Sequence, residues 1–118
     1  MGSTYTVLAP GRWWDDAQSA MESWRDEIDE GNGPGESGAL VVAQYWDGGR
    51  SVKQGRGYAH RFDLDLDGLQ FLRGEALYRY ELHTDELRYD GDSWNRSCRQ
   101  AAKTLLARCD AILMGQQA

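Results

Sequence analysis

The sequence predicts a single α+β domain, in which two amphipathic helices pack on one face of a mostly antiparallel sheet of four to five strands. The chain has 118 residues, a length that suits one hydrophobic core over 1–118. Apolar residues recur at helical spacing near both ends, over 13–30 and 94–114. Between these segments lie short runs in which apolar and polar residues alternate, as they do in strands. The expected order is therefore β-α-β-β-β-β-α.

The N-terminal part is expected to form a strand and then a helix. Residues 4–9 have strand-like composition and are followed by the breaker Pro10-Gly11. Over 13–30 the apolar side chains fall within about 120° of one another at helical spacing. They predict one buried stripe, which consists of Trp13, Trp14, Ala17, Ala20, Met21, Trp24 and Ile28.

The middle of the chain is expected to begin the sheet. Residues 31–38 are rich in glycine and predict a linker, and the apolar, β-branched run 39–46 predicts a central strand. A basic, glycine-rich loop is expected over 47–57, because a mobile solvated segment fits this composition better than a nucleic-acid site does. Residues 58–66 then alternate and predict another strand.

Further strands and a long helix are expected to complete the domain. Segments 69–72 and 75–83 predict one or two strands, and Thr84-Asp85 predicts a hairpin turn into 86–90. The last helix, over 94–114, has a core stripe made of Trp94, Cys98, Ala101, Ala102, Leu105, Cys109, Ile112 and Leu113.

The two cysteines, Cys98 and Cys109, fall in this last helix. Eleven residues at about 1.5 Å each separate them by roughly 16 Å, which is too far for a disulfide bond. They are expected to act as small core residues, and no spacing of Cys and His resembles a zinc site.

The segment RFDLDLDG, residues 61–68, matches the first half of an EF-hand calcium loop. The second half departs from that motif, because position twelve is Gly74 where a bidentate glutamate is needed. An alternating strand is therefore preferred, with Asp63 and Asp65 about 6.7 Å apart on its outer face. In the alternation of 58–66, His60 falls among the apolar positions and is expected in the core. In the alternation of 77–83, His83 falls among the polar positions and is expected to be exposed.

An enzymatic alternative uses the same acidic strand. Carboxylates and an imidazole from neighbouring strands can hold a divalent metal or act as acid and base. A metal-dependent hydrolase or nuclease would then use Asp63, Asp65, Glu81 and His83. No catalytic triad, phosphate-binding loop or dinucleotide fingerprint is present in the sequence, so neither an enzyme nor a cofactor is the preferred prediction.

Net charge is distributed unevenly. Residues 1–36 contain eight acids and two arginines, a balance of −6 that equals the net charge of the whole chain. On the helix over 13–30, acids cluster on the side opposite the apolar stripe. Such a row is either a solubilising face or a surface for a basic partner, and acids near the C-terminal end of a helix are slightly destabilising. Stability alone does not explain their position.

The preferred prediction is a small acidic, non-enzymatic protein-binding inhibitor in the cytoplasm. Its partner would be a protein with a basic, nucleic-acid-binding surface, and the chain would bind neither nucleic acid nor membrane directly. DNA-mimicking phage counter-defence proteins of the anti-CRISPR kind have this size and charge, and for such a protein the compartment is the cytoplasm of the host cell. The expected partner-binding residues are Asp15, Glu22, Asp26, Asp29, Glu30, Asp63 and Asp65.

Two further alternatives belong to other classes of binding protein. A toxin-neutralising immunity protein fits the same size and charge. A structural homodimer would use the abundant aromatic residues as a symmetric interface.

Overall fold

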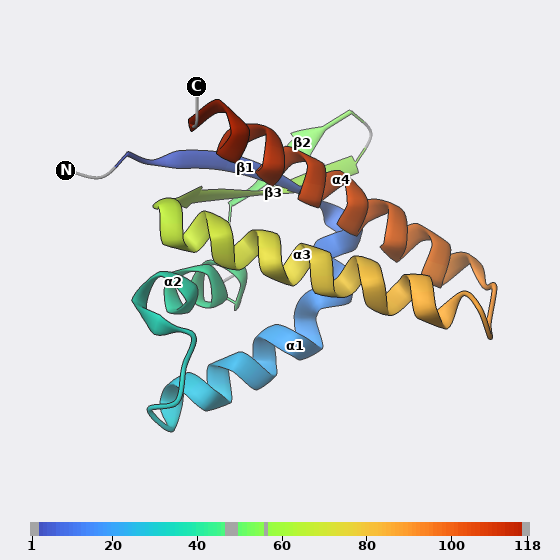
Figure 1. Cartoon of the computed structure of the whole chain (residues 1–118), viewed down its shortest axis with the longest axis horizontal. Helices are drawn as coiled ribbons and strands as arrows, with labels where there is room; N and C mark the ends of the chain where they lie inside the picture. Colours follow the sequence, from blue (N-terminus) through green and yellow to red (C-terminus); the bar gives the residue numbers. More distant parts are fainter. Residues whose placement is uncertain (1–2, 47–49, 56, 117–118) are drawn as a thin grey trace.

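The computed structural model describes residues 3–46, 50–55 and 57–116, and within them the order of elements is β-α-α-β-β-α-α (Figure 1). None of the helices in these ranges is long and apolar enough to cross a membrane. The elements are β1 (Tyr5–Pro10), α1 (Gly11–Asp29), α2 (Gly35–Trp46), β2 (Arg50–Gln54), β3 (Gly57–Leu64), α3 (Leu66–Glu86) and α4 (Ser93–Gln116).

The sheet is smaller than the sequence predicts. It has three antiparallel strands in the order β1-β3-β2, so the expected sheet of four to five strands is wrong, and the described part of the chain is mostly helical. Val7 of β1 lies opposite Phe62 of β3, and both side chains are buried. Their strand neighbours Thr6 and Arg61 are exposed, which is the alternation expected of a half-buried sheet.

The first and last helices form as the periodicity predicts. The buried residues of α1 include Trp13, Trp14, Ala17 and Met21, and Trp13 makes edge contacts with Tyr45 and Phe62. In α4, Cys98 and Cys109 are buried and both are free thiols. Figure 1 shows α3 and α4 running side by side, with α4 also along β1, whereas the C-terminal end of α1 reaches away from the sheet.

The predicted central strand 39–46 is instead the helix α2, and the predicted linker supplies its first turn. Its buried residues Val41, Val42 and Tyr45 follow the i, i+1, i+4 spacing of one helical face. A short run in which seven of eight residues are apolar fits a buried strand and a buried helix equally well by periodicity. Gly38 allows the close packing of this helix, because a Cβ there would lie 2.7 Å from Pro34 and 3.2 Å from Phe71.

The strands predicted over 69–72 and 75–83 are also wrong, since α3 runs through both and the expected turn at Thr84-Asp85 is helical. Its buried residues are Gly68, Leu69, Leu72, Ala76 and His83, several of which follow helical spacing. Residues 86–90 contain the end of this helix and a turn. The alternation of 77–83 is misleading because α2, α4 and β3 all contact α3, so its apolar residues are not confined to one stripe.

The acidic segment 61–68 spans the junction of β3 and α3. The strand ends at Leu64, and Asp65 is the N-cap of α3, where its Oδ1 accepts a hydrogen bond from the Gly68 N–H at 2.8 Å. Asp63 and Asp65 therefore do not share one strand face. Part of the expected basic loop is the strand β2, and residues 47–49 and 56 of that loop lie outside the described part of the chain.

Candidate functional site

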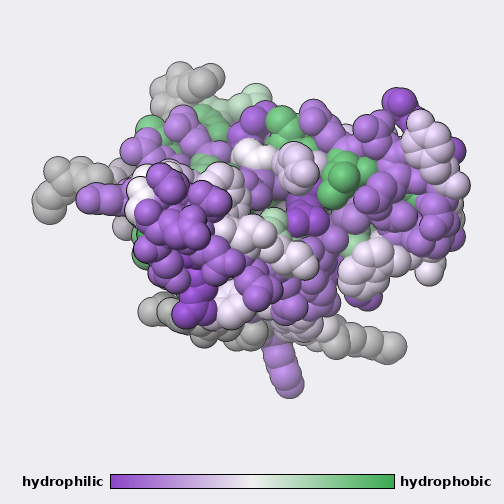
Figure 2. Space-filling model, turned by 90° about the horizontal axis from the view of Figure 1, so that it is seen from below, coloured by the Kyte–Doolittle hydropathy of each residue, from purple (hydrophilic) through white to green (hydrophobic). Residues whose placement is uncertain are grey.

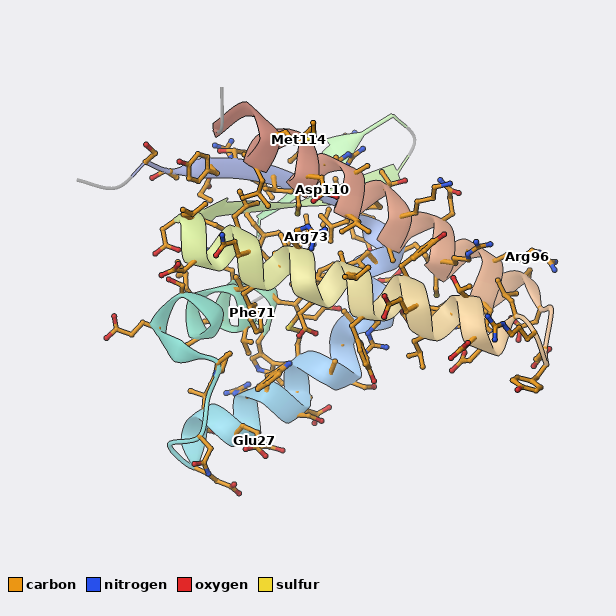
Figure 3. The ribbon with its side chains drawn as sticks, viewed as in Figure 1. Glu27, Phe71, Arg73, Arg96, Asp110 and Met114 are labelled. Carbon is orange, nitrogen blue, oxygen red and sulfur yellow. The ribbon has the colours of Figure 1, made fainter. Side chains whose placement is uncertain are left out.

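Most of the predicted partner-binding acids lie on α1. Glu22, Asp26, Asp29 and Glu30 are exposed, and we call these four residues the acidic ridge. Within residues 3–46, 50–55 and 57–116, none of their side chains takes part in an ion pair or a side-chain hydrogen bond. The adjacent Glu27 extends from α1 away from the other helices (Figure 3). The ridge therefore presents carboxylates that the described structure does not neutralise.

Asp15 lies on the same helix but is engaged. Its Oδ1 accepts a hydrogen bond from the Tyr58 hydroxyl at 2.7 Å, and Arg12 lies 4.0 Å from its Oδ2. The bond to Asp15, together with burial, raises the pKa of the Tyr58 hydroxyl. Asp15 thus ties the start of α1 to β3 and is less available to a partner than the acidic ridge is.

Asp63 and Asp65 have local structural partners. Asp63 accepts hydrogen bonds from Thr6 at 2.6 Å and from Arg61 at 3.3 Å, which links β1 to β3. Asp65 accepts one hydrogen bond from the Gly68 N–H and another from the Ser37 hydroxyl, each at 2.8 Å. These two hydrogen bonds lower the pKa of the Asp65 carboxyl. Both residues serve the junction of sheet and helices, and the structure assigns them no place on the acidic ridge.

Trp46, at the end of α2, lies between two hollows that border α1. Its side chain is 41% exposed, and the Arg25 guanidinium lies 4.7 Å from its ring centroid. One hollow, of about 250 Å³, is lined by Trp14, Gln18, Glu22, Tyr45 and Trp46. The other, of about 210 Å³, is lined by Arg25, Ile28, Asp29, Ala39, Val42, Ala43 and Trp46. Acids of the ridge thus border an exposed aromatic side chain.

The surface seen from the α1 side is mainly hydrophilic, with small hydrophobic patches between the polar side chains (Figure 2). An exposed apolar centre with a charged rim is the usual organisation of a protein–protein interface. We call Trp46, its two hollows and the acidic ridge the α1–α2 surface.

A second group of polar residues is buried where α1, α3 and α4 meet. It consists of Asp16, Arg79, His83, Asn95 and Cys98, which we call the buried polar cluster. His83 Nε2 lies 2.7 Å from Asp16 Oδ2, and His83 Nδ1 lies 2.8 Å from Asn95 Oδ1. Arg79 lies 3.8 Å from the other oxygen of Asp16. These side chains are nearly inaccessible, with exposed fractions of 7% for Asp16 and 4% for His83.

Cys98 completes this cluster. One ligand atom from each of Asp16, His83 and Cys98 lies within 4.8 Å of the other two. Burial, followed by the negative charge of Asp16, raises the pKa of the Cys98 thiol to about 12. The Arg79 Nε is buried and has no hydrogen-bond partner in the described part of the chain. Buried polar atoms are seldom left in that state.

Sequence patterns did not indicate this cluster, and the expectation that His83 is exposed is wrong. In the sequence Asp16 is one of eight acids within residues 1–36, and no motif distinguishes it from the others. The helical spacing does indicate that Asp16 is partly buried. At 100° per residue Asp16 lies about 100° around the helix from Asp15, and it lies beside Ala20 at the edge of the apolar stripe. His83, Asn95 and Cys98 come from other helices, and only the tertiary fold brings them to Asp16.

A third hollow, of about 460 Å³, lies between α1 and α3 and is lined by Ser19, Ala20, Ser23, Trp24, Glu75, Tyr78 and Arg79. Burial raises the pKa of the Glu75 carboxyl, while a hydrogen bond from Trp24 and the charge of Arg79 act in the opposite direction. Arg79 thus connects this hollow to the buried polar cluster.

The four residues of the predicted hydrolase site are not brought together. Asp65 caps the start of α3, and His83 lies eighteen residues later on the same helix, which corresponds to about 27 Å. Glu81 is exposed, whereas His83 faces Asp16 and Asn95 in the interior. No site of the proposed composition exists in this arrangement.

Comparison of the chain with protein-family models, with curated proteins and with solved structures found no match.

Proposed function

We propose that the protein is a non-enzymatic protein-binding inhibitor that covers a basic surface of its target with the α1–α2 surface. The observation that supports this proposal most directly is the position of Trp46. An exposed tryptophan lies between two hollows whose edges carry Glu22 and Asp29. Tryptophan is enriched among the residues that dominate binding energy in interfaces.

The charge of the acidic ridge supports a basic target. Its four carboxylates have no ion-pair partner in the described part of the chain, and the whole net charge of −6 is carried by residues 1–36. Opposite charges on a target would accelerate association and select against other acidic proteins. A protein that binds nucleic acid has such a surface, and its occupation by this chain would exclude the nucleic acid.

The test uses charge reversal with a matched control. The ridge variant carries Glu22→Lys and Asp26→Lys, and the control carries Glu81→Lys and Asp90→Lys, which change the net charge equally at exposed positions of α3 and the α3–α4 turn. Each protein is immobilised and exposed to lysate of the native host at low salt, and bound proteins are identified by mass spectrometry. A target should be retained by the wild type and the control, released at about 0.5 M salt, and absent from the ridge variant.

The captured target is then purified and tested for function. Addition of the wild-type protein should displace nucleic acid from it in a fluorescence-anisotropy assay, and Trp46→Ala should weaken this effect by at least about tenfold, which is the loss expected for an interface hot spot. Retention of the same target by the ridge variant, or capture of no protein by any variant, would contradict the proposal.

A further inference from the structure

We propose that Asp16, His83 and Cys98 form a binding site for a transition-metal ion, with Zn²⁺ as the ion that their donor atoms fit best. This site is separate from the α1–α2 surface and does not depend on the proposed inhibitor function. A carboxylate oxygen, an imidazole nitrogen and a thiolate sulfur are the three kinds of protein donor that zinc accepts.

The three donors are already gathered. Each contributes one atom that lies within 4.8 Å of the other two, and they come from α1, α3 and α4. Tetrahedral ligands about 2.1 Å from an ion lie about 3.4 Å apart. Asp16 Oδ2 and His83 Nε2, which are now 2.7 Å apart, would therefore separate by less than about 1 Å to admit the ion.

The surroundings of His83 match those of a metal ligand. A ligating histidine usually donates its second ring N–H to a fixed acceptor, which holds the ring and directs the other nitrogen at the metal. Asn95 Oδ1 is that acceptor, 2.8 Å from Nδ1, and Asn95 is itself buried and held by Asp92 through its backbone N–H. The other ring nitrogen, Nε2, faces Asp16 Oδ2 at 2.7 Å.

Arg79 supplies an independent observation. Its NH1 neutralises one oxygen of Asp16, yet its Nε is buried and has no hydrogen-bond partner in the described part of the chain. Three protein ligands leave one tetrahedral position of the ion for a water molecule. Such a water beside Asp16 would supply the hydrogen-bond acceptor that the Arg79 Nε lacks.

Binding of the ion requires defined atoms of Cys98 and His83 to lose their protons. Before binding, Cys98 is a free thiol whose sulfur lies beside the Asp16 carboxylate. On binding, the Cys98 Sγ–H bond breaks, its proton goes to solvent, and the sulfur electron pair forms the bond to the ion. His83 Nε2 gives up the hydrogen that it directs at Asp16 Oδ2, and this proton also goes to solvent. Nε2 then binds the ion through its lone pair, while Nδ1 keeps its proton and donates to Asn95.

The experiment uses the full-length protein, reduced and freed of metal by a chelator, with Co²⁺ and Zn²⁺ as probes. Co²⁺ should bind one equivalent, with the visible bands of a tetrahedral ion and a thiolate-to-cobalt charge-transfer band, and Zn²⁺ should displace it. Cys98→Ser should lose the charge-transfer band and weaken Zn²⁺ binding by at least about 100-fold in competition titrations. Cys109→Ser is the matched control and should behave as wild type, because Cys109 is equally buried on the same helix but lies outside the cluster.

If Cys98→Ser does not fold, a second variant and a measurement on the wild-type protein still test the proposal. Asn95→Ala leaves all three ligands in place and should weaken Zn²⁺ binding by about 10- to 100-fold. X-ray absorption of the wild-type zinc complex should show one sulfur and otherwise nitrogen or oxygen donors. Binding weaker than about 100 μM, a charge-transfer band that follows Cys109, or two sulfur donors would each overturn the proposal.

Discussion

The two halves of α1 use their acidic residues in opposite ways. Asp16, in the N-terminal half, is buried and contacts Arg79 and His83 of α3. Asp26, in the C-terminal half, is exposed and has no side-chain partner in the described residues. Both are aspartates on one helix and count equally toward the net charge. The net charge counted from the sequence therefore predicts the charge of the surface only after buried acids such as Asp16 have been subtracted.

The largest expected effect comes from Asp16. Asp16→Asn removes the charge that faces Arg79 and weakens the acceptor of His83, and removal of one member of a buried ion pair typically lowers the free energy of unfolding by about 3–5 kcal/mol. Asp15→Asn is the matched control and should lower it by less than about 1 kcal/mol, because Asp15 is exposed. Urea denaturation followed by tryptophan fluorescence measures both. Equal losses for the two variants would remove the distinction between the two halves of α1.

An intermediate effect is expected at Asp65, which is exposed but has two hydrogen-bonding partners. Hydrogen bonds from Gly68 and Ser37 lower the pKa of its carboxyl, so this group stabilises the fold above its unfolded pKa and the contribution is lost as the pH falls through the folded pKa. Asp65→Ala should lower the melting temperature at pH 7 by less than Asp16→Asn does, and the difference from wild type should shrink in the acidic range. Asp67→Ala is the control, and a constant difference at every pH would contradict the capping role.

A smaller change in stability, of opposite sign, is expected when Glu75 is replaced. Burial raises the pKa of its carboxyl, so its contribution to stability is present below the unfolded pKa and is lost as the pH rises through the folded pKa. Glu75→Gln removes the buried charge, keeps an acceptor for Trp24 and should slightly raise the melting temperature at pH 7. The gain should disappear at pH 4. A variant that is less stable than wild type at pH 7 would show that Glu75 stabilises the fold through its charge.

The smallest effect on stability is expected on the acidic ridge. Asp26→Lys places a positive charge near the C-terminal end of α1, where the helix dipole favours it, and should raise the free energy of unfolding by about 0.5 kcal/mol. The same variant should weaken binding to a basic target. A loss of more than about 1 kcal/mol in urea denaturation would mean that the ridge has a structural role.

The sequence predicted the elements whose residues face only one neighbouring surface. In α1 and α4 one apolar stripe faces the core, and helical periodicity is visible over about five or six turns. In α3 the buried positions Leu69, Leu72 and Ala76 are mixed with residues that contact other elements, so periodicity is weak and the alternation of 77–83 resembles a strand. In α2 the apolar run is too short for its period to be decided.

The buried polar cluster was unpredictable for a different reason. Asp16, His83 and Cys98 are far apart in the chain, and their spacing contains no local motif. Metal sites found from sequence have at least two ligands on one turn or hairpin, which fixes the spacing. Here each ligand comes from a separate helix, so packing of three helices must be known before the ligands can be grouped.

The projection of the C-terminal end of α1 away from the sheet has a consequence for local opening. The first turns of this helix are joined to β3 through Tyr58 and to α3 through Asp16, whereas its last turns rely on contacts such as Trp24 with Phe71. Backbone amides near residue 27 should therefore exchange with deuterium before those near residue 17. A partner that binds the α1–α2 surface would slow exchange selectively at the end that opens first, and so would stiffen the least protected part of the helix.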